Sequence, residues 1–163
     1  MDTIVKSVLN LPVLSVTKFP VGLQSRLKDV IKIINERSTE VCVIGICGGG
    51  GSGKTTLAKA VYHQVHGRFE YKSFIEDIAQ VSQTKGLVHL HEQLLSDVLK
   101  TKMEIRSVES GSRMIRERLS GKRMLIVLDG AIEYNPIHGW DRSFGRGTVI
   151  INYNKRRRPS KGT

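Results

Sequence analysis

Apolar residues recur every three or four positions in several segments of the chain, the spacing of one face of an α-helix. One such stripe starts at Leu23 and ends near Glu36, and another places Leu87, Leu90 and Leu94 on one side. The pattern predicts helices over residues 23–36, 57–65, 87–100 and 111–120, and a short amphipathic helix within residues 1–11.

Four other segments are short and largely apolar, and they predict strands. The run VCVIGI at residues 41–46 is continuous and rich in β-branched residues, which suits a strand covered on both faces. The remaining candidates are FIEDI at 74–78, MLIVL at 124–128 and TVIINY at 148–153. Strands that alternate with helices favour an α/β fold with a parallel sheet, here of about four strands.

Length and composition narrow the class of protein. A chain of 163 residues with 39% hydrophobic and 25% charged residues is typical of one globular unit. Its two cysteines, Cys42 and Cys47, cannot form a disulfide framework. No apolar run approaches the ~18 residues that span a membrane, and the amino terminus lacks a secretory apolar core. We therefore expect a cytoplasmic or nuclear protein with no membrane partner.

The formal charge of +11 is concentrated in part at the carboxyl terminus. Residues 155–163 read KRRRPSKGT and contain five basic side chains and no acid. Basic clusters can contact nucleic acid or direct nuclear import, but aromatic stacking residues are not interleaved with this one. We interpret residues 156–163 as a basic disordered tail, with at most weak and sequence-independent contact to nucleic acid.

A glycine-rich turn lies between the strand at 41–46 and the helix at 57–65. It reads GGGGSGKT and fits the pattern G-x-x-x-x-G-K-[ST]. In that pattern backbone N–H groups and a helix amino terminus bind phosphate oxygens. Lys54 would reach the β- and γ-phosphates, and the Thr55 hydroxyl would bind Mg²⁺. The predicted phosphate-binding residues are Gly48, Gly49, Gly50, Gly51, Ser52, Gly53, Lys54, Thr55 and Thr56. The alternative, a flexible glycine linker, does not explain the apolar strand before it and the periodic helix after it.

Asp129 follows the apolar strand MLIVL directly. An acid in that position commonly holds the Mg²⁺ shell of a P-loop protein, so Thr55 and Asp129 are the predicted metal ligands. The alternative is an ordinary turn aspartate after a buried strand. Solvated helix faces explain four of the five histidines better than metal binding does; these are His63, His66, His89 and His91.

The motifs and the segments between them resemble the NB-ARC nucleotide-binding domain of plant disease-resistance proteins. The nearest class carries an amino-terminal TIR domain and carboxy-terminal leucine-rich repeats. The resemblance covers about residues 19–155, and the segments that carry it are FPVGLQSRLKDVIKII (19–34), GICGGGGSGKTTLAKAVYHQV (45–65), FEYKSFIEDIAQVSQTKGLVHLHEQLLSDVL (69–99), GSRMIRERLSGKRMLIVLDG (111–130) and FGRGTVII (144–151).

The resemblance implies a P-loop NTPase-type, three-layer α/β fold with strand order 5-1-4-3-2. The four predicted strands would supply 1, 4, 3 and 2, which would leave the strand at 41–46 without its outer neighbour. An apolar strand at an edge promotes association, so we expect the chain to be marginal as a monomer. The expected division is an amino-terminal helix and linker at 1–18, a partial NB-ARC domain at 19–155, and the tail at 156–163.

The resemblance also implies a function. Such domains are signalling switches that are bound to ADP at rest and to ATP when active, with Mg²⁺. Val21 and Gly22 would lie near the adenine, and Lys155 near the phosphates. The implied partners are adenine nucleotide and other proteins, including full-length receptors of the same family, and the implied role is in the defence response.

The chain departs from the family pattern at the residues that would support hydrolysis. A second aspartate usually follows the first, and here that position is Gly130. The usual Thr-Thr-Arg of the third motif, whose arginine senses the γ-phosphate, reads Tyr153, Asn154 and Lys155. Lysine lacks the planar fork that grips phosphate. We expect a truncated or degraded copy that binds nucleotide with little or no turnover.

Two other functions remain open at this stage. A small P-loop phosphotransferase would need an acceptor-binding lid rich in arginine, and no such segment precedes the tail. A fragment that binds no nucleotide could act as a decoy through protein contacts alone. Retention of nucleotide by the purified chain distinguishes the decoy from the other two.

Overall fold

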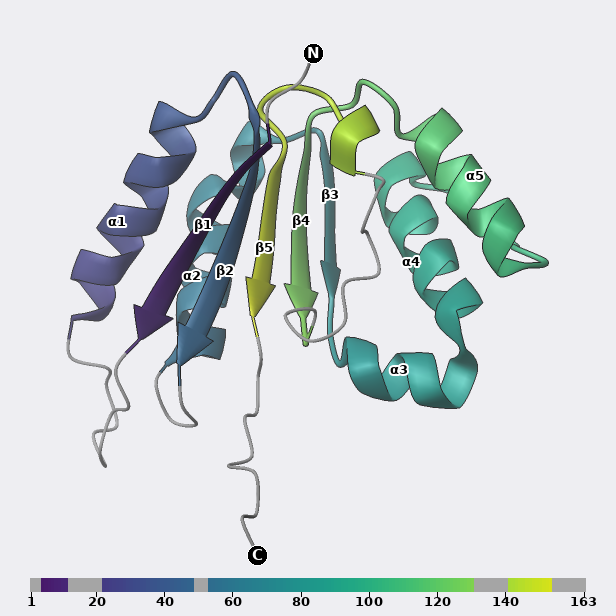
Figure 1. The fold of residues 1–163 in the computed structure, drawn as a ribbon, viewed down its shortest axis with the longest axis horizontal. Helices are drawn as coiled ribbons and strands as arrows, with labels where there is room; N and C mark the ends of the chain where they lie inside the picture. The colour runs from purple at the N-terminus through teal and green to yellow at the C-terminus, as the bar shows by residue number, and fades with distance from the viewer. Residues whose placement is uncertain (1–3, 12–21, 49–52, 131–140, 154–163) are drawn as a thin grey trace, which may run out of the picture.

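A sheet of five parallel strands forms the centre of the structure, a computed structural model that describes residues 4–11, 22–48, 53–130 and 141–153. The strand order is β1-β2-β5-β4-β3, and the carboxyl ends of all five strands lie at one edge (Figure 1). The strands are β1 (Ile4–Leu11), β2 (Val41–Gly48), β3 (Tyr71–Ile75), β4 (Met124–Asp129) and β5 (Val149–Tyr153).

The described part of the chain contains five α-helices around this sheet. They are α1 (Leu23–Glu36), α2 (Lys54–Val65), α3 (Ile78–Lys85), α4 (Leu87–Leu99) and α5 (Val108–Arg118). Single turns of 3₁₀-helix occur at His66–Arg68 and Asp141–Ser143. The predicted helices at 23–36, 57–65, 87–100 and 111–120 are confirmed as α1, α2, α4 and α5, whereas α3 was not predicted.

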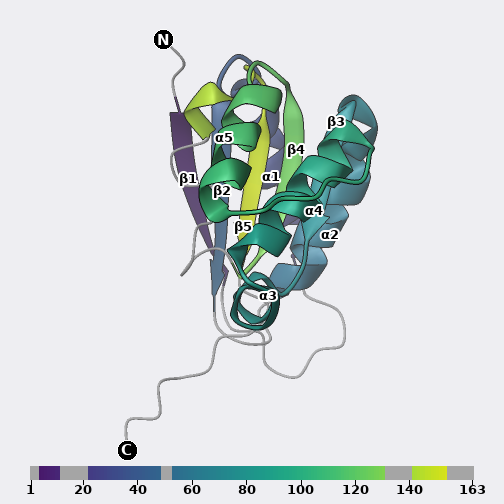
Figure 2. The ribbon, with the colours of Figure 1, turned by 90° about the vertical axis from the view of Figure 1, so that its right-hand side faces the viewer.

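Helices cover both faces of the sheet, so the fold is a three-layer α/β sandwich. Alternate residues of β4 point to opposite sides: Leu125 and Val127 pack with α1 and α2, whereas Ile126 and Leu128 pack with α3, α4 and α5. Figure 2 shows α3, α4 and α5 together near the β3 edge. Burial on both faces explains why the strand sequences are nearly continuous apolar runs. The predicted P-loop type of α/β fold with a parallel sheet is confirmed.

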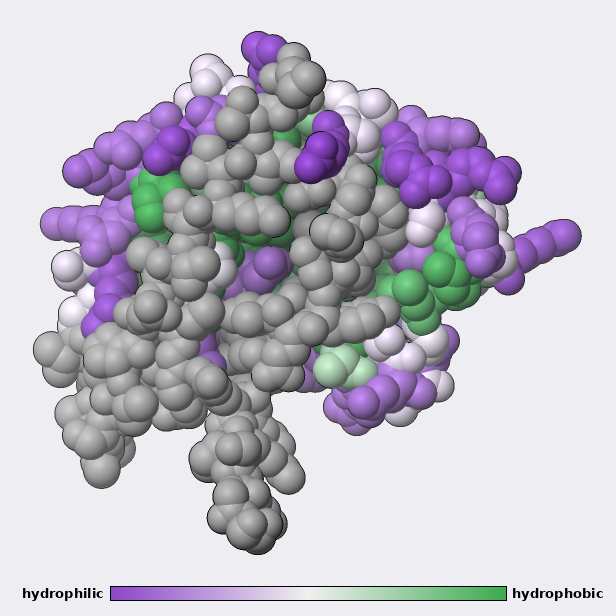
Figure 3. Space-filling model, viewed as in Figure 1, coloured by the Kyte–Doolittle hydropathy of each residue, from purple (hydrophilic) through white to green (hydrophobic). Residues whose placement is uncertain are grey.

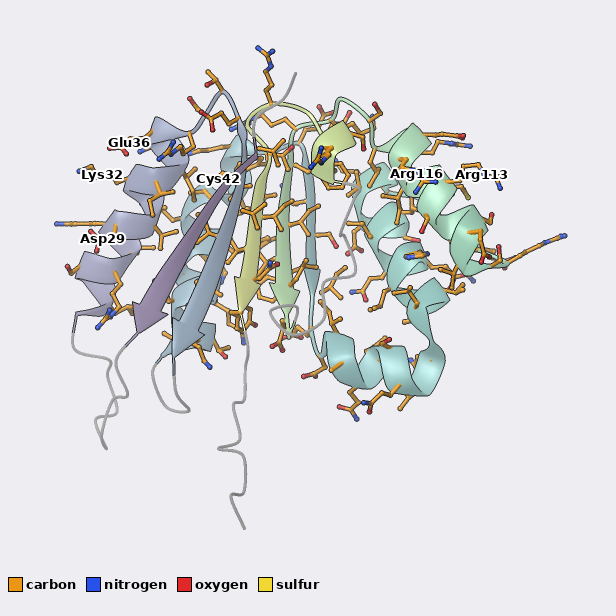
Figure 4. All side chains as sticks on the ribbon, in the orientation of Figure 1. Asp29, Lys32, Glu36, Cys42, Arg113 and Arg116 are labelled. Carbon is orange, nitrogen blue, oxygen red and sulfur yellow. The ribbon has the colours of Figure 1, made fainter. Side chains whose placement is uncertain are left out.

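Helix α1 is amphipathic, with one face against the sheet and the other exposed. Val30 and Ile34 are buried against the sheet, whereas Asp29, Lys32 and Glu36 point away from it (Figure 4). Hydrophilic surface covers the outer sides of α1 and α5 (Figure 3). The ion pair between Lys32 and Glu36, at 3.9 Å, is exposed and therefore contributes little to stability.

The amino-terminal segment is the main correction to the predicted fold. Residues 1–11 were expected to include a helix, but residues 4–11 form strand β1. This strand pairs in parallel with all of β2, from Ile4 opposite Val41 to Leu11 opposite Gly48. The pairing supplies the backbone partners that the outer side of β2 would otherwise lack.

Because β1 covers β2, two further expectations are wrong. The sheet has five strands rather than about four, and β2 lies inside the sheet rather than at its edge. The outermost strands of the sheet are β1 and β3. The argument that an exposed β2 would make the monomer marginal therefore loses its basis.

The strand predicted at residues 74–78 is also shifted. Strand β3 begins at Tyr71 and ends at Ile75, and α3 begins at Ile78. The chain changes direction at Asp77, whose φ of 51° lies in the left-handed region. A left-handed residue cannot continue a strand, so the apolar Ile78 belongs to the next element.

His91 does not lie on a solvated face, as was expected of the histidines. It is on α4 and is only 1% exposed, whereas His63 is exposed. Burial lowers the pKa of the His91 imidazole, because a charged ring would lose its solvation. The ring packs against Gly111 of α5, where an added Cβ would lie 2.2 Å from His91 Nδ1 and 3.0 Å from its Cβ.

This contact gives a test of the α4–α5 packing. Replacing glycine by alanine inside a helix usually stabilises it by about 1 kcal/mol. For Gly111→Ala we expect instead a loss of about 1–3 kcal/mol in the free energy of unfolding, as in an overpacked core. Urea denaturation measures it. Gly67→Ala is the matched control, because an added Cβ there meets nothing within 4 Å. Equal stabilities of the two variants would contradict the packing described here.

Candidate functional site

The carboxyl end of β2 leads through the glycine-rich turn to the start of α2. Gly48 is the last residue of β2, and Gly53 precedes α2 with a φ of 82°. That left-handed conformation is accessible to glycine without strain. Gly53 occupies the N-cap position of α2 and has no side chain to cap the helix, so the first N–H groups of α2 can donate to an anion. Gly49–Ser52 lie outside the described residues.

Lys54 is the first residue of α2 and is only 4% exposed. Thr55 is half-buried, Thr56 is exposed, and Lys59, one turn further on, is also exposed. Lys54 stands at the start of a helix, where backbone N–H groups and the helix dipole favour a bound anion such as phosphate.

Asp129 ends β4 on the same side of the sheet as α2. Leu125 and Val127 of β4 pack in the α1–α2 layer, and alternation along the strand places Asp129 on that side too. Its side chain is 1% exposed, and its Oδ2 accepts a hydrogen bond of 3.2 Å from the backbone N–H of Asp77.

The donor set at this edge fits Mg²⁺. Within the described residues, no group of three or more His, Cys, Asp or Glu side chains could hold a metal ion alone. Mg²⁺ does not need such a cage, because it commonly takes one or two protein oxygens and completes its shell with phosphate oxygens and water. Asp129 and the Thr55 hydroxyl are oxygen donors of the required kind.

Tyr153 lies directly opposite Asp129, as the last residue of β5. Its carbonyl oxygen accepts a hydrogen bond of 2.5 Å from the N–H of Gly130, whose φ is 90°. Burial raises the pKa of the Tyr153 hydroxyl, and the nearby carboxylates of Asp129, Glu76 and Asp77 raise it further. The hydroxyl is therefore a hydrogen-bond donor at every physiological pH.

Sequence reasoning missed three residues near this edge. Glu76 and Asp77 were placed in a strand, but they follow β3 and lie close enough to Tyr153 to affect its pKa. Tyr153 was considered only as a departure from a motif. The available signal was the same for all three, since each lies at the carboxyl end of a strand in a parallel sheet, and these ends share one edge.

Three further residues were predicted to contact the nucleotide, two near the adenine and one near the phosphates. Gly22 is exposed and precedes α1 with a φ of 85°. Val21 and Lys155 lie outside the described residues. A hollow of about 450 Å³ lies between α1 and α2, lined by Leu27, Ile31 and Gln64 among others. It is separate from Lys54 and Asp129, so the site is assigned on its chemistry rather than on cavity size.

The part of the chain that the structure describes contains no helix that is long and apolar enough to cross a membrane.

Comparison with known proteins identifies the family. Residues 23–145 match the NB-ARC domain. The chain is 42% identical to disease resistance protein RUN1 of Vitis rotundifolia, over 83% of this chain and 11% of that protein. It is 37% identical to RPV1 of the same species, over 80% and 10%, and 38% identical to RRS1B of Arabidopsis thaliana, over 67% and 8%.

The chain therefore spans about a tenth of the length of these relatives. The matched residues include the end of β2, the start of α2, and Asp129. The chain belongs to the NB-ARC domain family, as a nucleotide-binding module related to plant disease-resistance proteins.

Proposed function

We propose that the chain binds ADP or ATP with Mg²⁺ as the switch module of a plant disease-resistance signalling protein, and that it turns nucleotide over slowly or not at all. The observation that carries the proposal is the placement of buried Lys54, at the uncapped start of α2, on the same side of the sheet as buried Asp129. A phosphate-binding helix start and a metal-binding acid are the two halves of a P-loop site.

Each residue has a distinct role in this proposal. Backbone N–H groups from Gly48 to Thr56 would cradle the phosphates, and the Lys54 ammonium would neutralise their charge. Thr55 and Asp129 would hold Mg²⁺, directly or through water. A bound Mg²⁺ would supply charge stabilisation for the phosphate oxygens. The assignment of Val21 and Gly22 to the adenine, and of Lys155 to the phosphates, rests on the sequence resemblance.

Slow turnover follows from Gly130. A nucleoside triphosphatase needs a group that orients or deprotonates the attacking water, and such a group is worth about 10²–10⁴ in rate. Gly130 follows Asp129 and has no side chain to do so. Its φ of 90° also disfavours other residues at this position.

The relatives' names favour a role in disease resistance. Within that role, we propose that the partners are proteins, including full-length receptors of the same family, and that the chain acts in the cytoplasm or nucleus.

Replacing Lys54 tests nucleotide binding. We expect Lys54→Ala to lower the affinity for ADP and ATP by about tenfold or more, because it removes a charged hydrogen bond to phosphate. Isothermal titration calorimetry measures the dissociation constants. Lys59→Ala is the matched control, since it removes an exposed lysine from the same helix. Equal affinities for the two variants and the parent would refute the phosphate site.

Turnover is tested under single-turnover conditions, with phosphate release and ATP binding measured in parallel. We expect binding with phosphate release close to the uncatalysed background, because nothing at Gly130 can orient water. Rapid, repeated turnover by the unmodified chain would show that another residue performs this role.

Gly130→Asp extends the turnover test. The φ of 90° predicts a cost of about 1–2 kcal/mol in the free energy of unfolding for a residue with a Cβ. We therefore expect a less stable variant, and any increase in phosphate release should be partial. A stability equal to that of the parent would contradict the backbone conformation described for Gly130.

A further inference from the structure

The amino ends of strands β2 to β5 carry more basic than acidic side chains. This side of the sheet lies opposite the candidate site (Figure 1) and is built from residues 37–40, 66–72, 121–123 and 141–147. We call these four segments the basic edge. They contain seven lysines and arginines but only three acids. Five of the basic side chains are exposed arginines: Arg37, Arg68, Arg123, Arg142 and Arg146.

Printed contacts join the four segments into one surface. The N–H of Gly147 donates a hydrogen bond of 2.9 Å to the carbonyl oxygen of Glu40. A Cβ added at Gly147 would lie 2.7 Å from Nε of Arg123, so that arginine passes close to the same turn. Arg123 in turn donates a hydrogen bond of 2.7 Å to the carbonyl oxygen of Arg68. The basic side chains are therefore neighbours in space, although they are far apart in the sequence.

Aromatic rings hold two of the cations in place. The guanidinium of Arg123 lies 4.2 Å from the centre of the Phe69 ring, and Nζ of Lys122 lies 4.5 Å from the centre of the Tyr71 ring. Cations over ring faces are attracted by the π-electrons. Side chains that are already ordered lose less conformational entropy when a partner binds, so these contacts prepare the surface for an anion.

The positive charge of the basic edge is not neutralised within the described residues. Arg37, Arg68 and Arg142 form no ion pair with any acidic side chain described there. The carboxyl ends of α1, α2 and α5 also lie on this side of the sheet (Figure 1), and each carries about half a negative charge. These partial charges offset only part of the basic excess, so the surface attracts anions.

The chemistry of the surface favours carboxylates of a protein over nucleic acid. Arginine forks bind carboxylates and phosphates in the same bidentate way. Single-stranded nucleic acid also needs free aromatic faces for base stacking, but cations already cover the rings of Phe69 and Tyr71. The acids Glu40, Glu70 and Asp141 lie within the same segments and would repel the continuous phosphate backbone of a duplex. A peptide with spaced acidic residues can avoid these acids and still reach the arginines.

We propose that the basic edge is a docking surface for an acidic segment of a partner protein, whose carboxylates pair with the exposed arginines. The proposal does not depend on nucleotide binding, because the candidate site lies at the opposite ends of the strands.

The test measures binding of a fluorescent peptide of alternating glutamate and glycine to the full chain at low salt, by fluorescence anisotropy. The variant carries Arg37→Gln, Arg68→Gln and Arg142→Gln together. We expect its affinity for the peptide to be about tenfold lower than that of the parent, because several exposed ion pairs are lost at once. A peptide with glutamine in place of glutamate should bind neither protein.

A matched control removes the same amount of charge elsewhere. It carries Arg106→Gln, Arg113→Gln and Arg116→Gln, which are exposed side chains on α5 or just before it; Figure 4 labels Arg113 and Arg116. We expect this control to bind the peptide within about twofold of the parent. Lys54→Ala should also leave the affinity unchanged, because Lys54 lies at the opposite side of the sheet.

Thermal unfolding shows whether each variant folds like the parent. If the triple variant of the basic edge unfolds, Arg142→Gln alone replaces it, with an expected loss of about two- to threefold in affinity. No binding by the parent, equal losses in the two triple variants, or a loss in Lys54→Ala would overturn the proposal. It would also be wrong if duplex DNA bound more tightly than the peptide and lost affinity in the same variant, since the surface would then recognise nucleic acid.

Discussion

The candidate site depends on the pairing of β5 with two strands at once. Strand β5 lies between β2, which leads into the glycine-rich turn and Lys54, and β4, which ends at Asp129. The two functional residues are far apart in the sequence. Lys54 begins the helix that follows β2, and Asp129 ends β4, a strand that does not pair with β2. Since all three strands are parallel, their carboxyl ends meet on one side of the sheet, and the hydrogen bonds of β5 set the distance between the proposed phosphate-binding and metal-binding halves. The central strand therefore organises the site as well as the core.

This arrangement places polar groups where burial is costly. Lys54, Asp129, Asn152 and Tyr153 are all buried at the edge where the apolar strands end. The apolar layers on both faces of the sheet stabilise the fold enough to hold them there. Two of their atoms, Tyr153 Oη and Asn152 Oδ1, have no hydrogen-bond partner within the described residues, and departures of this kind from a fully satisfied fold are expected at functional sites. The left-handed Gly130 beside Asp129 belongs to the same pattern.

Much of the fold was predictable, because the buried strands are continuous apolar runs and the outer helices are amphipathic. The glycine-rich turn and Asp129 were proposed as a phosphate and metal site on a different basis, since that chemistry requires particular residues at a fixed spacing after a strand. Strand β1 was not predictable from its own sequence, because a short segment with apolar residues fits both the helical and the strand periodicity. Only pairing with β2 decides between helix and strand. His91 was misread because burial depends on the opposite helix, where Gly111 leaves room for the ring. The proximity of Tyr153 to Asp129 depends on strand register, which a single sequence does not specify.

Retention of nucleotide by the natural chain tests the central claim most directly. The protein is purified under native conditions in Mg²⁺ without added nucleotide, and the small molecules released on denaturation are identified by chromatography and mass spectrometry. The account predicts an adenine nucleotide in an amount comparable to the protein. A chain that folds, releases no nucleotide, and gives no heat on titration with Mg²⁺-ATP or Mg²⁺-ADP would contradict it.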